Sequence, residues 1–331
     1  MGEADLAAML YLLHDESGDG PPMTILDIGA NKGVVGIKFL EMFCTRHMRS
    51  TMWPTLNAFG PSALGWNNSA RTRDLLRMRN TQSFLANETA QAAFCPQVHF
   101  FEVAPGNVDL LERVRRLHHY PAASFVVHSV GVSDRPGKLL LRAGGGFRVG
   151  MEQATLASLP AKTRDGATTL VAEVPVVSID AWVGGQLSSQ LTPALSRAPQ
   201  ASSNRWPLSE RRFAFIKIDT EGFDLKVLHG MAGVLRAGRV RVVQFEYNKR
   251  MWKLVPDYGH KPLAEAVALA ESFGYEAYGQ PNATREWRSL AANSAELAAI
   301  QSRNANANIV LIMKGDPIKK LVDHMLRSKW Q

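Results

Sequence analysis

LDIGANKG, residues 26–33, joins a short apolar run to a helix-like segment through a turn with the pattern Gly-x-x-x-Gly. The run Thr24–Ile28 is typical of a buried strand, and glycines in the turn permit a tight bend or a close backbone approach to a ligand. The pattern differs from the G-x-G-x-x-G turn that holds a pyrophosphate at a helix N-terminus. Asp27 adds a carboxylate that could hold a cationic amine or sulfonium group, but a purely structural turn stays open at this point.

Further apolar runs follow, and they alternate with helical patterns. This alternation predicts a doubly wound α/β fold with a seven-stranded, mostly parallel sheet, the last two strands forming an antiparallel pair. The seven expected strands are 24–28, 98–103, 124–132, 213–219, 239–247, 275–278 and 307–313. Helices are expected over 34–43, 107–117, 223–235 and 261–273, and a small hairpin over 138–142 and 173–177.

The chain, residues 1–331, is predicted to be a single domain with two interruptions. Residues 44–96 stand where a short connection is expected, and a helical cap or substrate-binding insert explains them better than a structureless loop. Residues 184–211 are rich in Ser, Pro, Ala and Gln and are expected to form a flexible loop.

Acidic residues end two further strands. Glu102 could accept hydrogen bonds from the hydroxyls of a ribose at the crevice of an open α/β sheet, although the gap from the glycine turn exceeds the usual 20 or so residues. It could also be an ordinary surface glutamate. In FIKIDTEG, 215–222, helix capping explains one acid but not Lys217, Asp219 and Glu221 together. S-adenosylmethionine is positively charged and carries no phosphate, so it suits these carboxylates better than NAD does.

Taken in order along the chain, these motifs resemble the FkbM family of methyltransferases. FIKIDTEGFDLKVLHG (215–230) is the most specific piece, although Phe223-Asp224 stands where a small residue and Glu are more usual. Val103-Ala104 likewise replaces a commoner turn that contains proline. The other matching segments are LDIGANKG (26–33), FFEVAPGN (100–107), VGVSDRPGKLLL (130–141), VPVVSIDAW (174–182), VVQFEYN (242–248) and NANIVLIMK (306–314).

The resemblance implies a Rossmann-like class I methyltransferase that uses S-adenosylmethionine, with sugar or small-molecule O-methylation as the leading activity. O- and N-methylation stay open. Val132, Ser133 and Asp134 would lie near the adenine. The full set implied for the donor is Asp27, Gly29, Ala30, Asn31, Gly33, Glu102, Val103, Val132, Ser133 and Asp219.

Methyl transfer needs alignment of donor and acceptor, and a hydroxyl acceptor benefits from a general base. Asp219 is the first choice for this base, followed by Glu221, His128 and His229, although His128 could equally be a core residue. Glu246 could orient the acceptor. No spacing of His, Asp and Glu suggests a metal site, so no metal is expected.

Lys and Arg outnumber Asp and Glu by 38 to 30, which gives a formal charge of +8 and favours anionic partners. A small-molecule or sugar acceptor, possibly anionic, is expected. An RNA or protein methyltransferase and a non-catalytic scaffold are the alternatives, although no basic-aromatic array for nucleic acid is visible. Two cysteines, Cys44 and Cys95, are too few for a disulfide framework. Without a signal peptide or a long apolar run, a cytoplasmic protein is expected.

Overall fold

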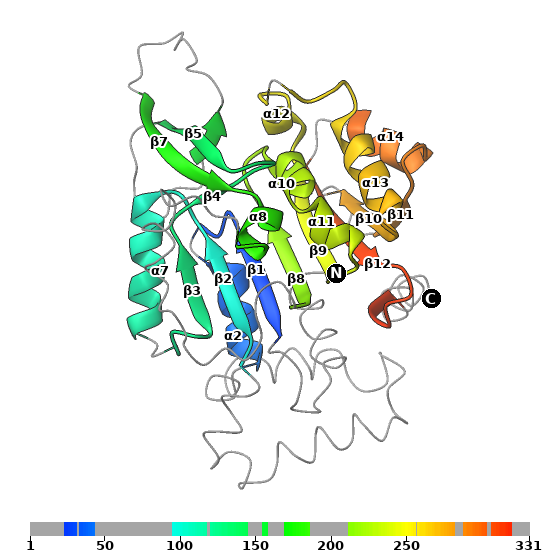
Figure 1. Cartoon of the computed structure of the whole chain (residues 1–331). Coiled ribbons are helices and arrows are strands. Elements are labelled where there is room, and N and C mark those ends of the chain that lie inside the picture. Colours follow the sequence, from blue (N-terminus) through cyan, green and yellow to red (C-terminus); the bar gives the residue numbers. More distant parts are fainter. Residues whose placement is uncertain are drawn as a thin grey trace, which may run out of the picture.

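The structure is a computed structural model, shown in Figure 1. It describes residues 23–31, 33–43, 95–117, 120–144, 154–157, 169–185, 211–255, 257–281, 287–302 and 306–319. The expected cap over 44–96 and the expected loop over 184–211 lie almost entirely outside these residues.

A central sheet organises the fold, with the strand order β11-β10-β12-β9-β8-β1-β2-β3. Five neighbouring strands are parallel, and three antiparallel strands continue the sheet beyond β9. The parallel strands are β1 (Thr24–Ile28), β2 (Gln97–Phe101), β3 (Phe125–His128), β8 (Phe213–Ile218) and β9 (Val240–Tyr247). The antiparallel strands are β12 (Ala307–Met313), β10 (Tyr275–Pro281) and β11 (Arg288–Leu290).

Six of the seven predicted strands are therefore confirmed, and β11 is added at the edge of the sheet. The prediction of one strand over 124–132 was wrong. β3 ends at His128, and β4 (Gly131–Val132) pairs with a strand of a second sheet. The apolar run continues across this break because Val130, between the two strands, is also buried.

The second sheet has the order β4-β7-β5-β6 and stands over the end of the central sheet where β2 and β3 finish (Figure 1). Its main pair is antiparallel, β5 (Gly137–Gly144) with β7 (Thr169–Val177), as the small hairpin predicted. β6 (Ala154–Ala157) lies between them in sequence and pairs with β5.

Helices cover both faces of the central sheet. On one face, α2 (Val34–Phe43) and α7 (Pro105–Leu117) pack against alternate strand residues such as Ile25. The neighbouring Leu26 faces the other cluster, beneath the remaining helices. Figure 1 shows α8 and α11 in front of the sheet and α2 behind it. The remaining helices are α8 (Ile179–Val183), α10 (Asp224–Gly230), α11 (Ala232–Arg236), α12 (Lys249–Trp252), α13 (Pro262–Ser272) and α14 (Ala295–Ser302).

The helix expected over 223–235 is two helices, so that prediction was wrong in extent. α10 ends at Gly230, and Met231 leaves helical geometry with φ −119° and ψ 14°. The carboxylate of Asp180 then accepts hydrogen bonds from the N–H groups of Gly233 (2.7 Å) and Val234 (2.9 Å). These bonds satisfy donors in the first turn of α11, which explains why a new helix begins there.

Within the described residues, no helix has the length and apolar character that crossing a membrane requires.

Candidate functional site

The glycine turn after β1 uses its backbone N–H groups internally. Gly29 and Ala30 both donate to the carbonyl oxygen of Phe101, at 3.0 and 3.1 Å, and Gly33 donates to Ala30 at 2.7 Å. Asn31 donates to the carboxylate of Glu102 at 2.6 Å. A pyrophosphate site depends on unused N–H groups, so the described part of this turn does not offer that chemistry.

Gly29 and Asn31 both have positive φ, 71° and 51°. A β-carbon at Gly29 would lie 1.9 Å from the carbonyl oxygen of Asp219, so only glycine fits between the ends of β1 and β8. Gly33 serves a different purpose, because its β-carbon would lie 2.4 Å from Leu111 of α7. The first glycine is needed for the approach of two strand ends, and the second for packing α2 against α7.

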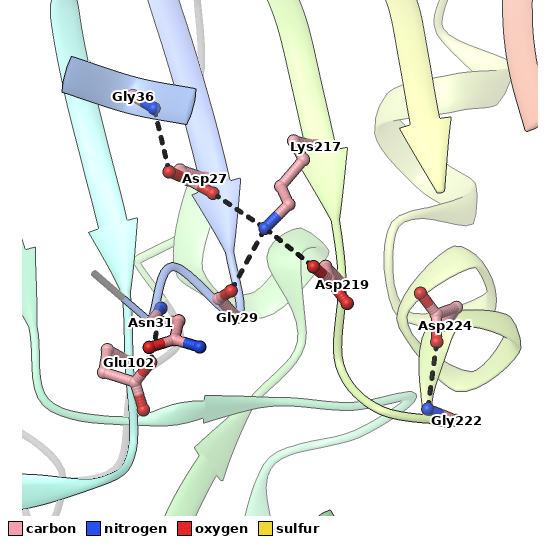
Figure 2. Close-up of polar contacts among 9 residues, drawn as sticks. All are labelled: Asp27, Gly29, Asn31, Gly36, Glu102, Lys217, Asp219, Gly222 and Asp224. Atoms are coloured by element: carbon pink, nitrogen blue, oxygen red, sulfur yellow. Dashed lines mark hydrogen bonds and ion pairs between the residues drawn. The ribbon is translucent and has the colours of Figure 1, made fainter. Parts of the chain in front are cut away.

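Lys217 joins the acidic residues of two neighbouring strands, as Figure 2 shows. Its ammonium lies 3.5 Å from Asp27 Oδ1 and 3.2 Å from Asp219 Oδ2, and it donates to the carbonyl oxygen of Gly29 at 3.2 Å. Asp27 Oδ2 also accepts the N–H of Gly36 at 2.9 Å. Burial raises the pKa of the Asp27 carboxyl, and the nearby Lys217 opposes that rise. Asp27 therefore lies beneath the turn and supports it, while Asp219 lies at the surface of the site.

The carboxylate of Glu102 links the end of β2 to the glycine turn through hydrogen bonds. In addition to Asn31, its carboxylate accepts the N–H groups of Val103 (2.8 Å) and Ala104 (2.7 Å). Burial raises the pKa of Glu102, and these hydrogen bonds oppose the rise. A carboxylate has about four acceptor positions, so a ribose hydroxyl would have to share them with the backbone.

The turn after β8 carries a partly exposed carboxylate. The side chain of Asp219 is 40% exposed, and its backbone N–H donates to the carbonyl oxygen of Ile28 at 2.9 Å. Glu221 has φ 52° and Gly222 has φ 110°. A β-carbon on Gly222 would lie 2.9 Å from the backbone of Met251, so the turn is pressed against α12. The short helix after β9 thus borders the acidic turn.

Two further carboxylates complete an acidic cluster. Asp224, in the first turn of α10, is buried, and burial together with the charges of Asp219 and Glu246 raises its pKa to about 7. Burial and the charge of Asp219 also raise the pKa of Glu246, near the end of β9. Asp224 was not among the candidates from sequence, where its only signal was an unusual residue at that point of the motif. Lys217 was noticed there but was given no role.

His128 and His229 lie elsewhere. His128 is buried on β3, three strands from β8, where its Nε2 lies 2.9 Å from His99 Nδ1 and its ring stacks on Phe101. Burial lowers its pKa to about 3, so it is neutral at physiological pH. His229, on α10, is exposed and lies 3.1 Å from Glu265 of α13. Neither ring is among the groups that contact Asp219 in the described part of the chain.

Val132 is the last residue of β4, and Ser133 directly follows it. Val132 is buried in β4, and Ser133 donates its hydroxyl to Asp134 at 2.9 Å. The carbonyl oxygen of Ser133 would lie 2.0 Å from a β-carbon on Gly230, so this loop packs on the end of α10. The segment expected near the adenine is therefore on the same side of the sheet as α10.

The residues at the turn fit a cationic ligand that lacks phosphate. Asn31 Oδ1 and Thr220 Oγ1 have no hydrogen-bond partner within the described part of the chain. Both can accept hydrogen bonds. Asn31 donates its backbone N–H to the carboxylate of Glu102, and Thr220 directly follows Asp219 in the sequence. Ammonium and ribose hydroxyl groups are donors of the kind that such a set accepts. Among the residues that the structure describes, no three His, Cys, Asp or Glu side chains are grouped as metal ligands.

The solved structures that resemble this chain include three methyltransferases, each at low sequence identity and with a low TM-score. The methyltransferase FkbM from Methylobacillus flagellatus is 15% identical, with a TM-score of 0.28 over 75% of this chain, and the match spans 42% of that chain. The precorrin-6y C5,15-methyltransferase from Geobacter metallireducens is 9% identical, with a TM-score of 0.31 over 93% of this chain and 87% of that one. The human methyltransferase 10 domain containing protein is 10% identical, with a TM-score of 0.30 over 95% and 83%.

A search of curated proteins gives no match. The family described as the methyltransferase FkbM domain matches residues 27–277, which include the end of β1, the glycine turn, Glu102 and the whole acidic turn after β8. The match covers well over half of the chain and agrees with the resemblance of the individual motifs. The chain belongs to the FkbM methyltransferase family.

Proposed function

We propose that this chain uses S-adenosylmethionine to methylate a hydroxyl group of a small molecule or sugar. One observation carries the choice of donor. The described backbone N–H groups of the turn after β1 already donate hydrogen bonds to acceptors within the protein, and carboxylates lie beside the turn. That arrangement suits a cationic ligand and not a pyrophosphate. The family assignment supports methyl transfer as the reaction.

For the donor, we assign direct contacts to Asn31, Glu102 and Asp219, and supporting roles to Asp27 and Gly29. Asp27 is buried and bonded to Gly36 and Lys217, so it holds the turn from below. Gly29 permits the approach of the two strand ends. The other assigned positions border the donor through backbone or packing: Ala30, Gly33, Val103, Val132 and Ser133.

The bound donor would supply an electrophilic methyl group on a positively charged sulfur. Asp219 is assigned as the general base that accepts the hydroxyl proton of the acceptor while the acceptor oxygen bonds to the methyl carbon. Lys217 lies against its Oδ2, which leaves the other carboxylate oxygen for the acceptor. Glu221 is the second choice for the base. His128 and His229 rank below both because each has another partner and neither contacts Asp219.

Donor binding is the first test, measured by calorimetry with S-adenosylmethionine, S-adenosylhomocysteine and NAD. We expect both sulfur compounds to bind and NAD not to bind. Asp27→Ala is expected to weaken donor binding more than tenfold, because its loss removes the support of the turn. Asp109→Asn, at an exposed position of α7, is the control and should leave affinity unchanged.

The acceptor class is tested with methyl-labelled donor and separate extracts of small molecules, RNA and protein. Label in the small-molecule fraction supports the proposal, and its loss in Asp219→Asn assigns the base. Label that appears only in RNA or protein would replace the small-molecule proposal with one of its alternatives. Donor binding without transfer into any fraction would favour a non-catalytic scaffold.

The expected cytoplasmic location stays a prediction. Cell fractionation would test it.

A further inference from the structure

A cavity of about 540 Å³ lies beside α12, and its lining is basic. Four lining residues can carry positive charge, and none of the lining residues is acidic. These basic residues are Lys249, Lys253, His260 and Lys261. A cavity of this volume matches small-molecule sites, which typically measure about 300–1,000 Å³.

The basic side chains are available to a ligand. Lys253, His260 and Lys261 are exposed, and no ion pair joins them to any residue in the part of the chain that the structure describes. Close to Gly259 of the lining is the carboxylate of Glu265, whose Oε2 would lie 3.9 Å from a β-carbon built on that glycine. The other oxygen of Glu265, Oε1, lies 3.1 Å from His229 Nε2. The positive charge of this cavity is therefore not neutralised locally.

The cavity also borders the acidic turn. Tyr247, in its lining, directly follows Glu246, and the hydroxyl of Tyr258 accepts the N–H of Lys226 at 3.2 Å in the first turns of α10. α12, which lines the cavity with Lys249 and Trp252, contacts Gly222 through Met251. The indole N–H of Trp252 has no acceptor within the described residues. The cavity and the proposed methyl-transfer site thus share α12 as a common wall.

We infer that this cavity binds the anionic group of the methyl acceptor, so that the acceptor is a small hydroxylated molecule with a phosphate or carboxylate. The inference rests on the proposed function, because the cavity supplies the acceptor to Asp219. Lys253 and Lys261 hold the anion, and Tyr258 and Trp252 form the wall toward the reacting end. The charge of the cavity excludes cationic acceptors and gives neutral ones no advantage.

The test compares three sugars of similar size, glucose, glucuronate and glucose 6-phosphate, by calorimetry at low and high salt in the presence of S-adenosylhomocysteine. We expect one or both anionic sugars to bind, with affinity that falls as salt rises, and glucose not to bind. The stronger of the two anions identifies carboxylate or phosphate as the recognised group. Inorganic phosphate serves as a minimal probe that does not depend on the sugar.

The decisive variant is Lys253→Gln/Lys261→Gln, matched by Arg113→Gln/Lys314→Gln, which removes the same charge from exposed positions elsewhere. The cavity variant should weaken binding of the anionic probe about tenfold and leave binding of S-adenosylmethionine unchanged, and the control should change neither. Equal weakening in both variants, or no binding of any anionic probe, would overturn the inference. Failure of S-adenosylmethionine to bind the wild type would instead count against the proposed function, and the two failures are thereby distinguished.

Discussion

A β-carbon placed on Gly29 would lie 1.9 Å from the carbonyl oxygen of Asp219. The two residues follow neighbouring parallel strands, and the N–H of Asp219 donates to the carbonyl oxygen of Ile28 at 2.9 Å. The glycine turn and the acidic turn are therefore in direct backbone contact. A shift in one turn must move the other, which couples the proposed donor site to the proposed base.

Gly29→Ala should destabilise the protein by about 3 kcal/mol or more, because the new methyl group meets backbone atoms that cannot rotate away and because φ is positive there. Urea unfolding of the two proteins measures the difference. Gly137→Ala is the matched control, since a β-carbon there meets nothing within 4 Å. If both alanine variants lose the same stability, the close approach of the two turns is not a constraint.

Lys217→Met should cost about 3–5 kcal/mol, the range seen when one partner of a buried ion pair is removed. Asp27 is fully buried, and the substitution leaves it without its nearest cation. Lys217→Met combined with Asp27→Asn should recover part of that loss, because the uncompensated charge is gone. A double-mutant cycle by chemical denaturation measures the coupling. Additive losses would show that the pair contributes little.

The sheet could be predicted largely because its central strands are short apolar runs with turn residues between them. β1 and β8 illustrate this, since every residue of both is buried. The run 124–132 misled for the same reason: both sides of its break are buried, so burial alone does not show where one sheet ends. The pairing of β4 with β7 depends on residues 45 positions apart, and no local pattern records it.

Asp27, Glu102 and Asp219 were found from sequence because they stand at or near the ends of strands, whereas Asp224, in the first turn of α10, was missed. Which carboxylate supports a turn and which faces the ligand depends on strand register, so the sequence could not show these separate roles. Lys217 reaches Asp27 because β1 and β8 place these two residues opposite each other. Glu102 engages the backbone of Asn31, 71 positions away, and only the folded chain brings them together. The basic cavity beside α12 is likewise assembled from α12, α13 and α14.

Asp224→Asn should stabilise the protein at pH 8 and have little effect near pH 4. The folded-state pKa of Asp224 is raised to about 7 from 3.8, so the folded protein favours the protonated form. Its contribution to stability is therefore present below pH 4 and is lost as the pH rises toward 7. The shift corresponds to a gain of up to about 4 kcal/mol at pH 8 for the neutral amide, whose oxygen can still accept the N–H of Gly222.

Thermal unfolding from pH 4 to 8 checks this prediction, with Asp109→Asn as the exposed control. The difference between the melting temperatures of Asp224→Asn and wild type should widen steadily with pH, and the control should show no such trend. A difference that is constant across the range would mean that Asp224 does not titrate as a buried, crowded carboxyl.

The buried pair His99 and His128 should make the protein sensitive to mild acid. Burial lowers the pKa of both rings, that of His128 to about 3, and the nitrogens not shared between them have no hydrogen-bond partner in the described part of the chain. The unfolded chain binds protons at these rings below about pH 6.5 and the folded chain does not, so stability falls as the pH drops. For His128 alone the loss between pH 7.5 and pH 5 is about 2 kcal/mol.

Urea unfolding of wild type and His128→Gln at these two pH values separates the stability loss due to His128 from that due to the other titrating groups. The variant is expected to be less stable than wild type at pH 7.5, because it loses the ring stacking with Phe101. Its further loss on going to pH 5 should nevertheless be smaller than that of wild type by about 2 kcal/mol, since glutamine does not titrate. His229→Gln, at an exposed position, should follow wild type at both pH values. An equal loss in wild type and His128→Gln would mean that the buried ring is not the acid-sensitive group.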